Sequence, residues 1–443
     1  MSPGKAVRAA KGHERRLELL LLSARTGVNF VAHRARLLVT PPDRRRAAEE
    51  RFQLRTAADV ADALGNMKGA LMKVGQIASY VGDGLPEAFR TALADLQQDA
   101  PPMSAELAAQ VVEEELGAPP HRLFARWDSE PMAAASIGQV HGAVTVEGRD
   151  VAVKVQYPGV DHAIRSDLAN AGWLFAMLGQ MFPGMEPGPI VDEIKARLLE
   201  ELDYRIEAGN QRLFADYYDG HPLIHVPPVL DEYSTGRVLT TELAVGARFD
   251  ELERWSERER DLAGETIVRF VFGSLFRMHA FNGDPHPGNY LFRPGGRVTF
   301  LDFGLVKRFT PEEVAIVEKL IKAMSVDQDP HAFRVALESA GFLKGGQPFS
   351  DEHVADYFRH FFSFASSGGT TSFTPEYANK TVKRLMDTSG PYADIMKAGN
   401  APPFAVVLQR INLGLLAILG RLHATADWRA VMSELWPSAG ASS

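Results

Sequence analysis

Three polar residues in the second half of the chain have the types and the order that phosphoryl transfer requires. Asp284 and Asn289 lie five positions apart in the segment GDPHPGN, whose prolines and glycines predict a tight turn. Asp302 follows eighteen residues after Asp284, in the tripeptide Asp-Phe-Gly. In phosphoryl transfer the protein mainly positions the reacting groups and neutralises the charge on the phosphate oxygens. An aspartate near the acceptor and an Asn/Asp pair on Mg²⁺ would meet that need.

A short strand is expected to position Asp302. The run Val298–Leu301 is apolar and β-branched, which predicts a buried strand that ends just before Asp302. Each residue alone has a plain structural interpretation, in which Asp284 and Asn289 cap turns and Asp302 ends a strand. The order D-x4-N followed by D-F-G matches the second half of the protein-kinase signature, and this combination favours phosphoryl transfer.

A candidate phosphate-binding lysine lies earlier in the chain. Segments Gly138–Val146 and Asp150–Val155 are predicted to be antiparallel strands, and Lys154 ends the pattern Val-Ala-Val-Lys that is typical of a strand lysine on nucleotide phosphates. The loop before the strands holds small residues that let the backbone approach a phosphate, although plain close packing is the alternative. Its residues are Ala133, Ala134, Ala135 and Ser136.

A long amphipathic helix is predicted over residues 191–218, and it carries Glu201, Asp203 and Glu207. The carboxylates at 203 and 207 should share a helix face. Glu207 is a candidate partner for Lys154, because a kinase lysine is held by a helix glutamate. Two strands are expected in 225–243, followed by a linker at Glu242 and Ala244 on which adenine would lie.

The order of these candidates predicts an α+β, two-lobed protein-kinase-like fold with a mostly helical second lobe. We expect helices over 104–125, 248–260, 261–281, 311–344, 350–365, 374–399 and 402–435. The expected domains are a basic amphipathic segment (1–45), a helical extension (46–125), an N-lobe with a helical insertion (126–243), a C-lobe (244–437) and a disordered tail (438–443).

The composition is that of a globular protein. The chain has 443 residues, of which 45% are hydrophobic, so it can bury a large core. It has no cysteine, which excludes disulfides and thiolate chemistry. No stretch is long and apolar enough for a membrane span, and no secretory signal is recognised at the start. These features predict a cytoplasmic protein.

The charge is unevenly distributed. Residues 1–55 carry 13 Lys and Arg against 5 Asp and Glu, whereas the whole chain has a net charge of −8. This basic head is suited to an anionic membrane surface, although a solvated helix explains it equally well. Residues 14–38 predict an amphipathic helix, which would lie at a membrane interface or dock on the body. No pattern for nucleic-acid binding is present.

Taken together, the motifs resemble those of the UbiB/AarF/ADCK family of atypical kinases, from about residue 55 to 430. Lys73-Val74-Gly75-Gln76 resembles the family's KxGQ motif, and Ala133–Ser136 resembles its alanine-rich nucleotide loop. Glu201 and Asp203 resemble its ExD motif. Lys154 and Glu207 match its nucleotide lysine and the lysine's partner, while Asp284, Asn289 and Asp302 match its catalytic-loop pair and its metal aspartate.

The resemblance implies a fold that binds ATP and Mg²⁺. It further implies that Lys73, Gln76, Glu201 and Asp203 form a gate over the acceptor site, and that the alanine loop disfavours ordinary protein phosphorylation. Members of the family are linked to isoprenoid quinone biosynthesis and to lipid homeostasis at membranes, with ATP hydrolysis as the suggested reaction. An anionic membrane surface and a prenylated quinone precursor are therefore candidate partners.

Two other functions stay open at this point. DPHPGN also resembles the loop of aminoglycoside and choline kinases, which suggests a small-molecule phosphotransferase. KxGQ and ExD argue against it, because such enzymes need an open acceptor cleft. The second alternative is a nucleotide-sensing module without turnover, although no catalytic residue is missing.

Overall fold

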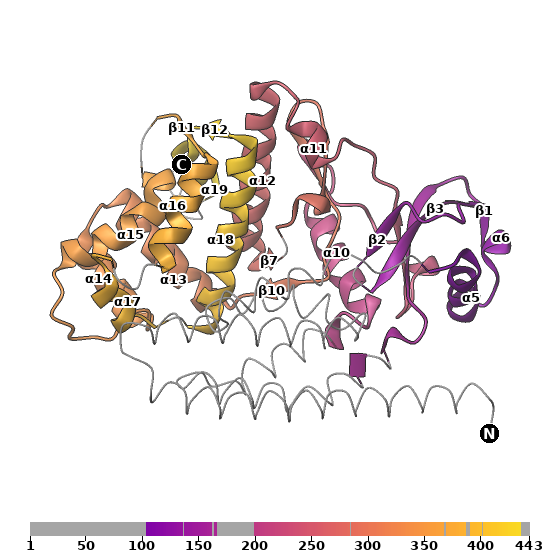
Figure 1. Cartoon of the computed structure of the whole chain (residues 1–443), viewed down its shortest axis with the longest axis horizontal. Helices are drawn as coiled ribbons and strands as arrows, with labels where there is room; N and C mark the ends of the chain where they lie inside the picture. The colour runs from indigo at the N-terminus through magenta and orange to yellow at the C-terminus, as the bar shows by residue number, and fades with distance from the viewer. Residues whose placement is uncertain are drawn as a thin grey trace, which may run out of the picture. The chain divides into compact units, whose positions relative to one another are not determined.

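The computed structural model describes residues 103–135, 137–161, 164–165, 199–283, 285–366, 369–386, 390–400 and 402–435. The chain divides into two compact units. Figure 1 labels the helices and strands of both. The first unit runs to Gly148 and adds Val153–Tyr204 and Thr235–Leu239. The second unit comprises Arg149–Ala152, Arg205–Ser234 and the chain from Thr240 onward.

The first unit contains most of a five-stranded sheet with the order β1-β3-β4-β6, in which β2 also pairs with β3. Alternate residues of β4 point to opposite faces, and Val151, Val153 and Val155 are fully buried. The β3–β4 hairpin therefore confirms the predicted strand pair, and Gly148 turns it with a φ of 85°. The strands are β1 Phe124–Trp127, β2 Ala133–Ala135, β3 Gly138–Thr145, β4 Asp150–Gln156 and β6 Val238–Glu242.

The helix predicted over 104–125 is wrong in its second half. Helix α5 (Ala105–Leu116) begins at Ser104, whose side chain accepts a hydrogen bond from the Leu107 N–H, and ends at Gly117 with a φ of 79°. One further helical turn, α6 (Pro120–Leu123), leads directly into β1. The expected loop at Ala133–Ala135 is also wrong, because these residues form β2 antiparallel to β3.

All of α10 except its first residue belongs to the second unit, which is organised around α12. Helix α10 is shorter than the predicted 191–218 helix, since residues 201–202 form a turn and Asp203 precedes the helix. Its elements up to residue 308 are α10 Tyr204–Tyr217, β5 Ile224–His225, η2 Asp231–Tyr233, α11 Phe249–Leu252, α12 Glu257–Met278, β7 Ala280–Asn282, η3 Pro287–Asn289, β8 Tyr290–Arg293, β9 Arg297–Phe300 and β10 Val306–Arg308.

The loop between β7 and β8 connects two small sheets. Strands β8 and β9 form an antiparallel hairpin with Tyr290 opposite Phe300, and β5 pairs with β9 in parallel. Strand β10 pairs with β7, with Val306 opposite Asn282. Strand β9 confirms the predicted buried strand before Asp302. The strand pair expected in 225–243 is corrected, because β5 joins β9 and β6 joins the sheet of the first unit.

The rest of the second unit is helical, apart from the short pair β11 (Thr371–Ser372) and β12 (Thr425–Ala426). The helices expected over 311–344 and 402–435 are each interrupted by a residue with positive φ, Gln328 at 49° and His423 at 51°. The helices are α13 Pro311–Ile321, the π-helix η4 Lys322–Val326, α14 Pro330–Ser339, α15 Asp351–Ser366, α16 Pro375–Met386, α17 Ala393–Ala398, α18 Pro403–Leu422 and α19 Trp428–Leu435.

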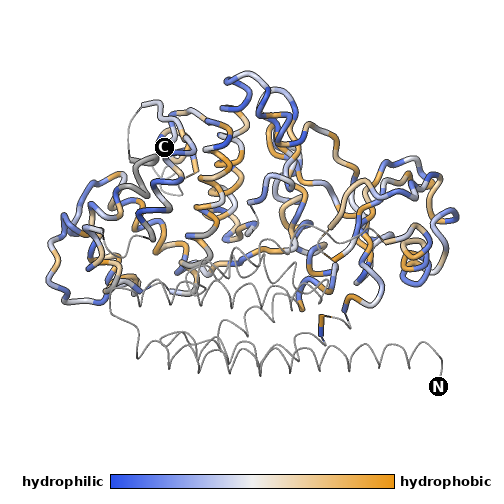
Figure 2. Tube along the Cα trace, in the orientation of Figure 1, coloured by the Kyte–Doolittle hydropathy of each residue, from blue (hydrophilic) through white to orange (hydrophobic). Residues whose placement is uncertain are grey.

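The core of the second unit lies around α12 and α18, which carry long apolar stretches (Figure 2). A smaller apolar cluster joins η4, α14, α15 and α17. Gly264 on α12 allows close approach, since a Cβ there would lie 2.7 Å from Ala424 Cβ. Among the described residues, no helix combines the length and apolar character that crossing a bilayer requires.

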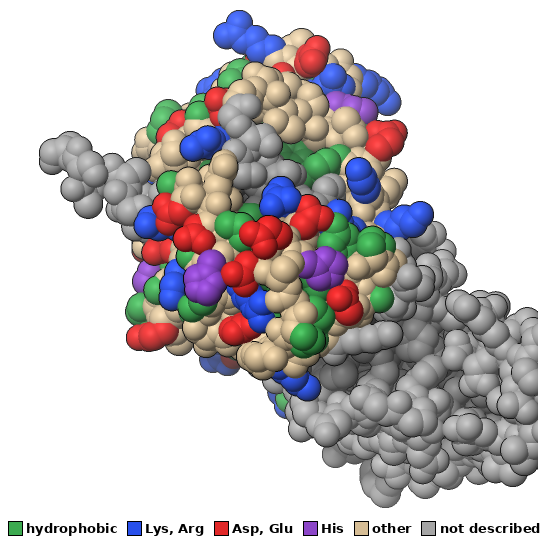
Figure 3. All heavy atoms as spheres, turned by 90° about the vertical axis from the view of Figure 1, so that its left-hand side faces the viewer, with side chains coloured by type: hydrophobic (Ala, Val, Ile, Leu, Met, Phe, Trp, Pro, Cys, Tyr) green, Lys and Arg blue, Asp and Glu red, His purple; other side chains and the backbone are tan. Residues whose placement is uncertain are grey.

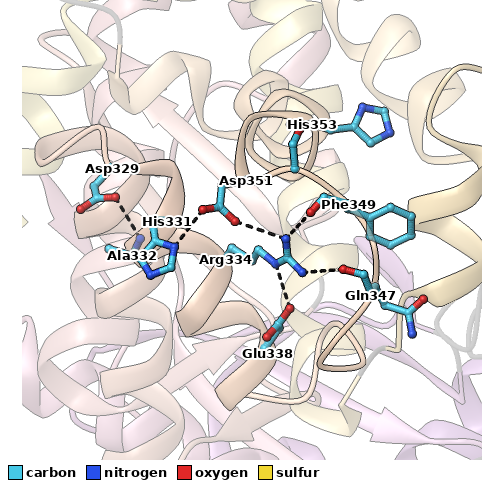
Figure 4. A network of polar contacts seen from close by, with 10 residues as sticks. Asp329, His331, Ala332, Arg334, Glu338, Gln347, Phe349, Asp351 and His353 are labelled. Carbon is cyan, nitrogen blue, oxygen red and sulfur yellow. Dashed lines mark hydrogen bonds and ion pairs between the residues drawn. The ribbon is translucent and has the colours of Figure 1, made fainter.

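Arg334 ties α14 to the chain before α15 (Figure 4). Its side chain is only 16% exposed, and its guanidinium donates to Glu338 Oε1 at 2.9 Å and to the carbonyl oxygens of Gln347 and Phe349. Asp351 accepts from both Arg334 and His331. On the outer face of these helices, acidic, basic and histidine side chains lie next to one another (Figure 3).

Candidate phosphoryl-transfer site

The structure brings Asn289 and Asp302 to neighbouring strand ends. The carbonyl oxygen of Asn289 accepts a hydrogen bond from the Leu301 N–H at 3.0 Å, one residue before Asp302. The Asn289 N–H in turn donates to His286 at 2.9 Å, which closes the η3 turn. The hairpin register of β8 and β9 thus carries both predicted metal ligands to one edge of the sheet.

Phe303 anchors the Asp-Phe-Gly segment in the core. Its side chain is fully buried, and its ring centroid lies 5.0 Å from that of Phe214 on α10 and 6.5 Å from that of Phe270 on α12. Burying a phenylalanine contributes about 1.5–3 kcal/mol to the free energy of unfolding. The aspartate and the glycine on either side are therefore held by a strongly buried neighbour.

The carboxylates of Asp302 and Glu207 border the same small space at Gly304. A Cβ built on Gly304 would lie 3.2 Å from Asp302 Oδ1 and 3.7 Å from Glu207 Oε2. Glu207, on α10, is only 7% exposed, and Asp302 Oδ1 accepts a hydrogen bond from the Gly304 N–H at 2.9 Å. The space beside Gly304 is therefore bordered by two carboxylates.

This arrangement fits a magnesium ion that is shared with a phosphate. Among the residues that the structure describes, no group of three or more His, Asp or Glu side chains forms a dedicated metal cage. Mg²⁺ is usually held by one or two carboxylates together with substrate phosphates and water. Asp302 and Asn289, which lie at neighbouring strand ends, match that pattern of sparse protein ligands in residue type.

Lys154 lies on β4, in the first unit. Its Nζ is 5.1 Å from the ring centroid of Tyr204, which belongs to the same unit. Gly138 makes this close packing of β3, β4 and Tyr204 possible, because a Cβ there would overlap the Val155 carbonyl and lie 2.9 Å from the Tyr204 hydroxyl.

The remaining predicted residues fall into three places. Glu201 lies in a turn and Asp203 directly follows it, so neither lies on the helix as predicted. The Asp203 N–H donates to the main-chain carbonyl oxygen of Glu200 at 3.2 Å. Ala133–Ala135 form a strand, with Met132 bonded to Val140 at 2.8 Å. Four residues lie outside the described ones, and these are Lys73, Gln76, Ser136 and Asp284.

The predicted linker is fixed to its surroundings at both ends. Strand β6 ends at Glu242, whose Oε1 lies 3.0 Å from His225 Nε2. The N–H of Leu243 donates to the main-chain carbonyl oxygen of Asp150 at 3.0 Å. After Ala244, the N–H of Ala247 donates to the Phe292 carbonyl at 2.8 Å. Hydrogen bonds thus fix the backbone on both sides of this segment.

Sequence reasoning missed three residues that support the site. Asn282 Nδ2 donates to the carbonyl oxygen of Asp302 at 2.7 Å, and Asn210 Nδ2 donates to that of Phe303 at 3.1 Å. Gly414 on α18 faces Pro285. The asparagines carry no local signal, whereas a glycine inside a long helix is a recognised sign of close packing.

Comparisons with known proteins bear on the family and the fold of the chain. The family profile described as the ABC1 atypical kinase-like domain matches residues 95–334. The chain is 34% identical over 283 residues to the protein ACTIVITY OF BC1 COMPLEX KINASE 8 of Arabidopsis thaliana, covering 61% of this chain and 37% of that relative. The chain thus spans well under half the length of this chloroplast relative.

A mitochondrial relative and a solved structure match over more of their length. The atypical kinase COQ8B of Rattus norvegicus is 32% identical over 391 residues, covering 86% of this chain and 72% of that protein. The structure of Rv3197 with erythromycin, from Mycobacterium tuberculosis, matches with a TM-score of 0.66 and 32% identity, covering 85% of this chain and 94% of the other. Because the profile match takes in more than half of the sequence, the chain belongs to the ABC1 atypical kinase-like family and has its kinase-like fold, as the UbiB/AarF/ADCK resemblance predicts.

Proposed function

We propose that this protein is an atypical kinase or ATPase that binds Mg²⁺ and ATP. The observation that carries the proposal is that the Asp302 and Glu207 carboxylates border one space at Gly304, while Asn289 is bonded to Leu301, the residue before Asp302. Phosphoryl transfer depends on positioned groups that neutralise charge. In this proposal Asp302 and Asn289 hold Mg²⁺, which when bound offsets the charge on the phosphate oxygens.

Each remaining residue has a stated role in the proposal. Lys154 binds phosphate oxygens, and Glu207 orients the lysine. Asp284 orients the attacking hydroxyl or water and accepts its proton. The alanine loop and the segment from Glu242 to Ala244 contact the nucleotide. A gate over the acceptor is formed by Lys73, Gln76, Glu201 and Asp203.

We further propose that this activity supports isoprenoid quinone or lipid metabolism at a membrane surface. The support comes from the family to which the chain belongs and from the basic residues 1–55, which suit an anionic surface. In this view the protein is cytoplasmic and contacts the membrane peripherally.

A phosphate-release assay separates the proposed function from its alternatives. The full chain is incubated with Mg²⁺ and ATP, with and without anionic liposomes and a prenylated phenol. Release that rises with either addition supports the proposal. Turnover that depends on an aminoglycoside or choline favours a small-molecule phosphotransferase. Erythromycin is tested as well, because the structural neighbour was solved with it. Release at background in every arm indicates a nucleotide-sensing module.

A further inference from the structure

We propose that Asn210 and Asn282 are positioning residues that set the Asp302 carboxylate for a divalent cation. The inference rests on the proposed function, in which Asp302 holds Mg²⁺. Neither asparagine belongs to the predicted motifs. Each donates its side-chain amide to a main-chain carbonyl of the Asp-Phe-Gly segment, at 2.7 Å to Asp302 and at 3.1 Å to Phe303.

The Asn210 bond acts on the peptide group that holds the carboxylate. The Phe303 carbonyl and the Gly304 N–H belong to one planar trans peptide, so they point in opposite directions. Asn210 holds the carbonyl end, while the N–H end donates to Asp302 Oδ1 at 2.9 Å. Fixing the carbonyl therefore also fixes the donor that orients the carboxylate.

Asn282 holds the preceding peptide, whose carbonyl oxygen belongs to Asp302. It ends β7 and pairs with Val306 of β10, and the next residue, Gly283, donates its N–H to Leu305 at 2.7 Å. The chain from Asp302 to Val306 is thus bonded to β7 through both its side-chain and its main-chain contacts. Buried Phe303 fixes where the segment lies, and the two amides fix how its peptides are turned.

The Asn210 bond also couples α10 to the metal ligand. Asn210 follows Glu207 by three residues, so both lie on one face of α10. A shift of this helix would move the Glu207 carboxylate and the Phe303 peptide together. We therefore expect the affinity for a divalent cation to depend on an asparagine that does not touch the cation.

The test replaces the donor without changing the shape of the side chain. In Asn210→Asp the amide donor is lost and a carboxylate faces the Phe303 carbonyl. Thermal unfolding of the full chain is followed with ATP in EDTA and with ATP over a Mg²⁺ titration. We expect the Mg²⁺ concentration that gives half of the Mg²⁺-dependent rise in melting temperature, the Mg²⁺ midpoint, to increase about tenfold, equivalent to about 1.4 kcal/mol. The rise in melting temperature that ATP gives in EDTA should be retained.

Asn400→Asp is the matched control. Asn400 Nδ2 also donates to a main-chain carbonyl, that of Gly341 at 3.1 Å, far along the chain in the helical part. Its substitution should lower the melting temperature at most and leave the Mg²⁺ midpoint unchanged. An equal change of the midpoint in both variants would show a merely structural effect and overturn the inference.

The outcomes separate this inference from the proposed function. If the wild type shows Mg²⁺-dependent stabilisation that Asp302→Asn abolishes, but Asn210→Asp keeps the wild-type midpoint, only the positioning role fails. If the wild type shows no Mg²⁺-dependent stabilisation with ATP, the proposed function and the inference fail together. Should Asn210→Asp not fold, Asn282→Asp tests the second donor in the same way.

Discussion

Gly414 of α18 lies against Pro285 of the loop that precedes Asn289, with no room for a side chain between them. A Cβ on Gly414 would overlap the Pro285 ring, closer than real Cβ atoms approach. A helix from the C-terminal part of the chain thus directly supports the loop that carries two of the proposed site residues, Asp284 and Asn289.

Gly414→Ala is expected to destabilise the protein and to impair the site. Alanine is the better helix former by about 1 kcal/mol, but overpacking against Pro285 should cost about 1–3 kcal/mol. Gly209→Ala is the control, since Gly209 lies inside α10 with nothing near its Cβ position. Urea unfolding should show a lower free energy of unfolding for Gly414→Ala and a higher one for Gly209→Ala. A free energy of unfolding that rises as much in Gly414→Ala as in the control would contradict this packing.

Gly304→Ala should weaken cation binding. Its methyl group would enter the space bordered by the Asp302 and Glu207 carboxylates, and the Asp302 oxygen at 3.2 Å would have to move. The backbone of Gly304 is not in the left-handed region, so strain is not a competing cause. We expect the Mg²⁺ midpoint with ATP to rise several-fold, on the order of 1 kcal/mol.

Gly345→Ala is the control for that experiment. It places a methyl group 3.7 Å from Glu338 Oε2, in the turn between α14 and α15, which holds no predicted site residue. The midpoint should stay at the wild-type value. A Gly304→Ala protein with wild-type Mg²⁺ dependence would mean that no cation binds between these carboxylates.

Acid is expected to destabilise the first unit through His141. The Gln139 amide donates to its Nε2 and its Nδ1–H donates to the Asp128 carbonyl, so the bonded ring is neutral. Burial, the largest cause, lowers the pKa of His141, although the Asp128 carbonyl and carboxylate oppose it. The ring stacks on Trp127, with centroids 4.7 Å apart.

The sign of the pH dependence follows from this lowered pKa. The unfolded state binds the proton more readily, so the contribution to stability is complete above the unfolded pKa of about 6.5 and is lost as the pH falls toward the folded value. The loss is at most about 1.4 kcal/mol per pH unit. Urea unfolding between pH 8 and 5 should show that the free energy of unfolding of the wild type falls as the pH falls. The free energy of His141→Gln should depend less steeply on pH. Equal slopes would contradict the neutral state.

Arg334→Lys should destabilise the helical part of the second unit without affecting nucleotide binding. A lysine cannot reproduce the fork that reaches Glu338 and the carbonyl groups of Gln347 and Phe349. Leaving these part-buried acceptors without their donor should cost on the order of 1 kcal/mol. Arg359→Lys is the control, because its ion pair with Asp356 is about half exposed and such pairs contribute about 0–1 kcal/mol. Thermal unfolding with and without Mg²⁺ and ATP should give a lower melting temperature for Arg334→Lys than for Arg359→Lys, with the same ligand-dependent rise in both. Equal melting temperatures of the two variants would contradict the role of the network.

The sequence predicts local structure well where periodicity decides it. The alternation around Lys154 and the apolar run before Asp302 both become strands, because burial of one face fixes their register. Prediction fails where a single residue interrupts a pattern. Gly117 ends α5, and the turn at 201–202 places Asp203 before α10 instead of on it. The amphipathic period continues through such breaks, so periodicity alone does not reveal them.

The supporting residues of the site depend on tertiary contacts. Asn210 lies 93 residues from its partner Phe303, and Asn282 lies 20 residues from Asp302. Nothing in the neighbouring sequence distinguishes these asparagines from others that cap turns or face solvent. The motif residues were found because their order along the chain is itself the signal, whereas the residues that orient them are identified only in three dimensions.

The central claim is that Asp302 holds Mg²⁺ for a bound nucleotide. Isothermal titration of ATP into the full chain, with Mg²⁺ and in EDTA, tests it directly with Asp302→Asn and with Asp219→Asn, an exposed aspartate in the same unit. We expect Asp302→Asn to abolish the gain in ATP affinity that Mg²⁺ gives, while Asp219→Asn retains it. A full Mg²⁺-dependent gain in Asp302→Asn would contradict the account.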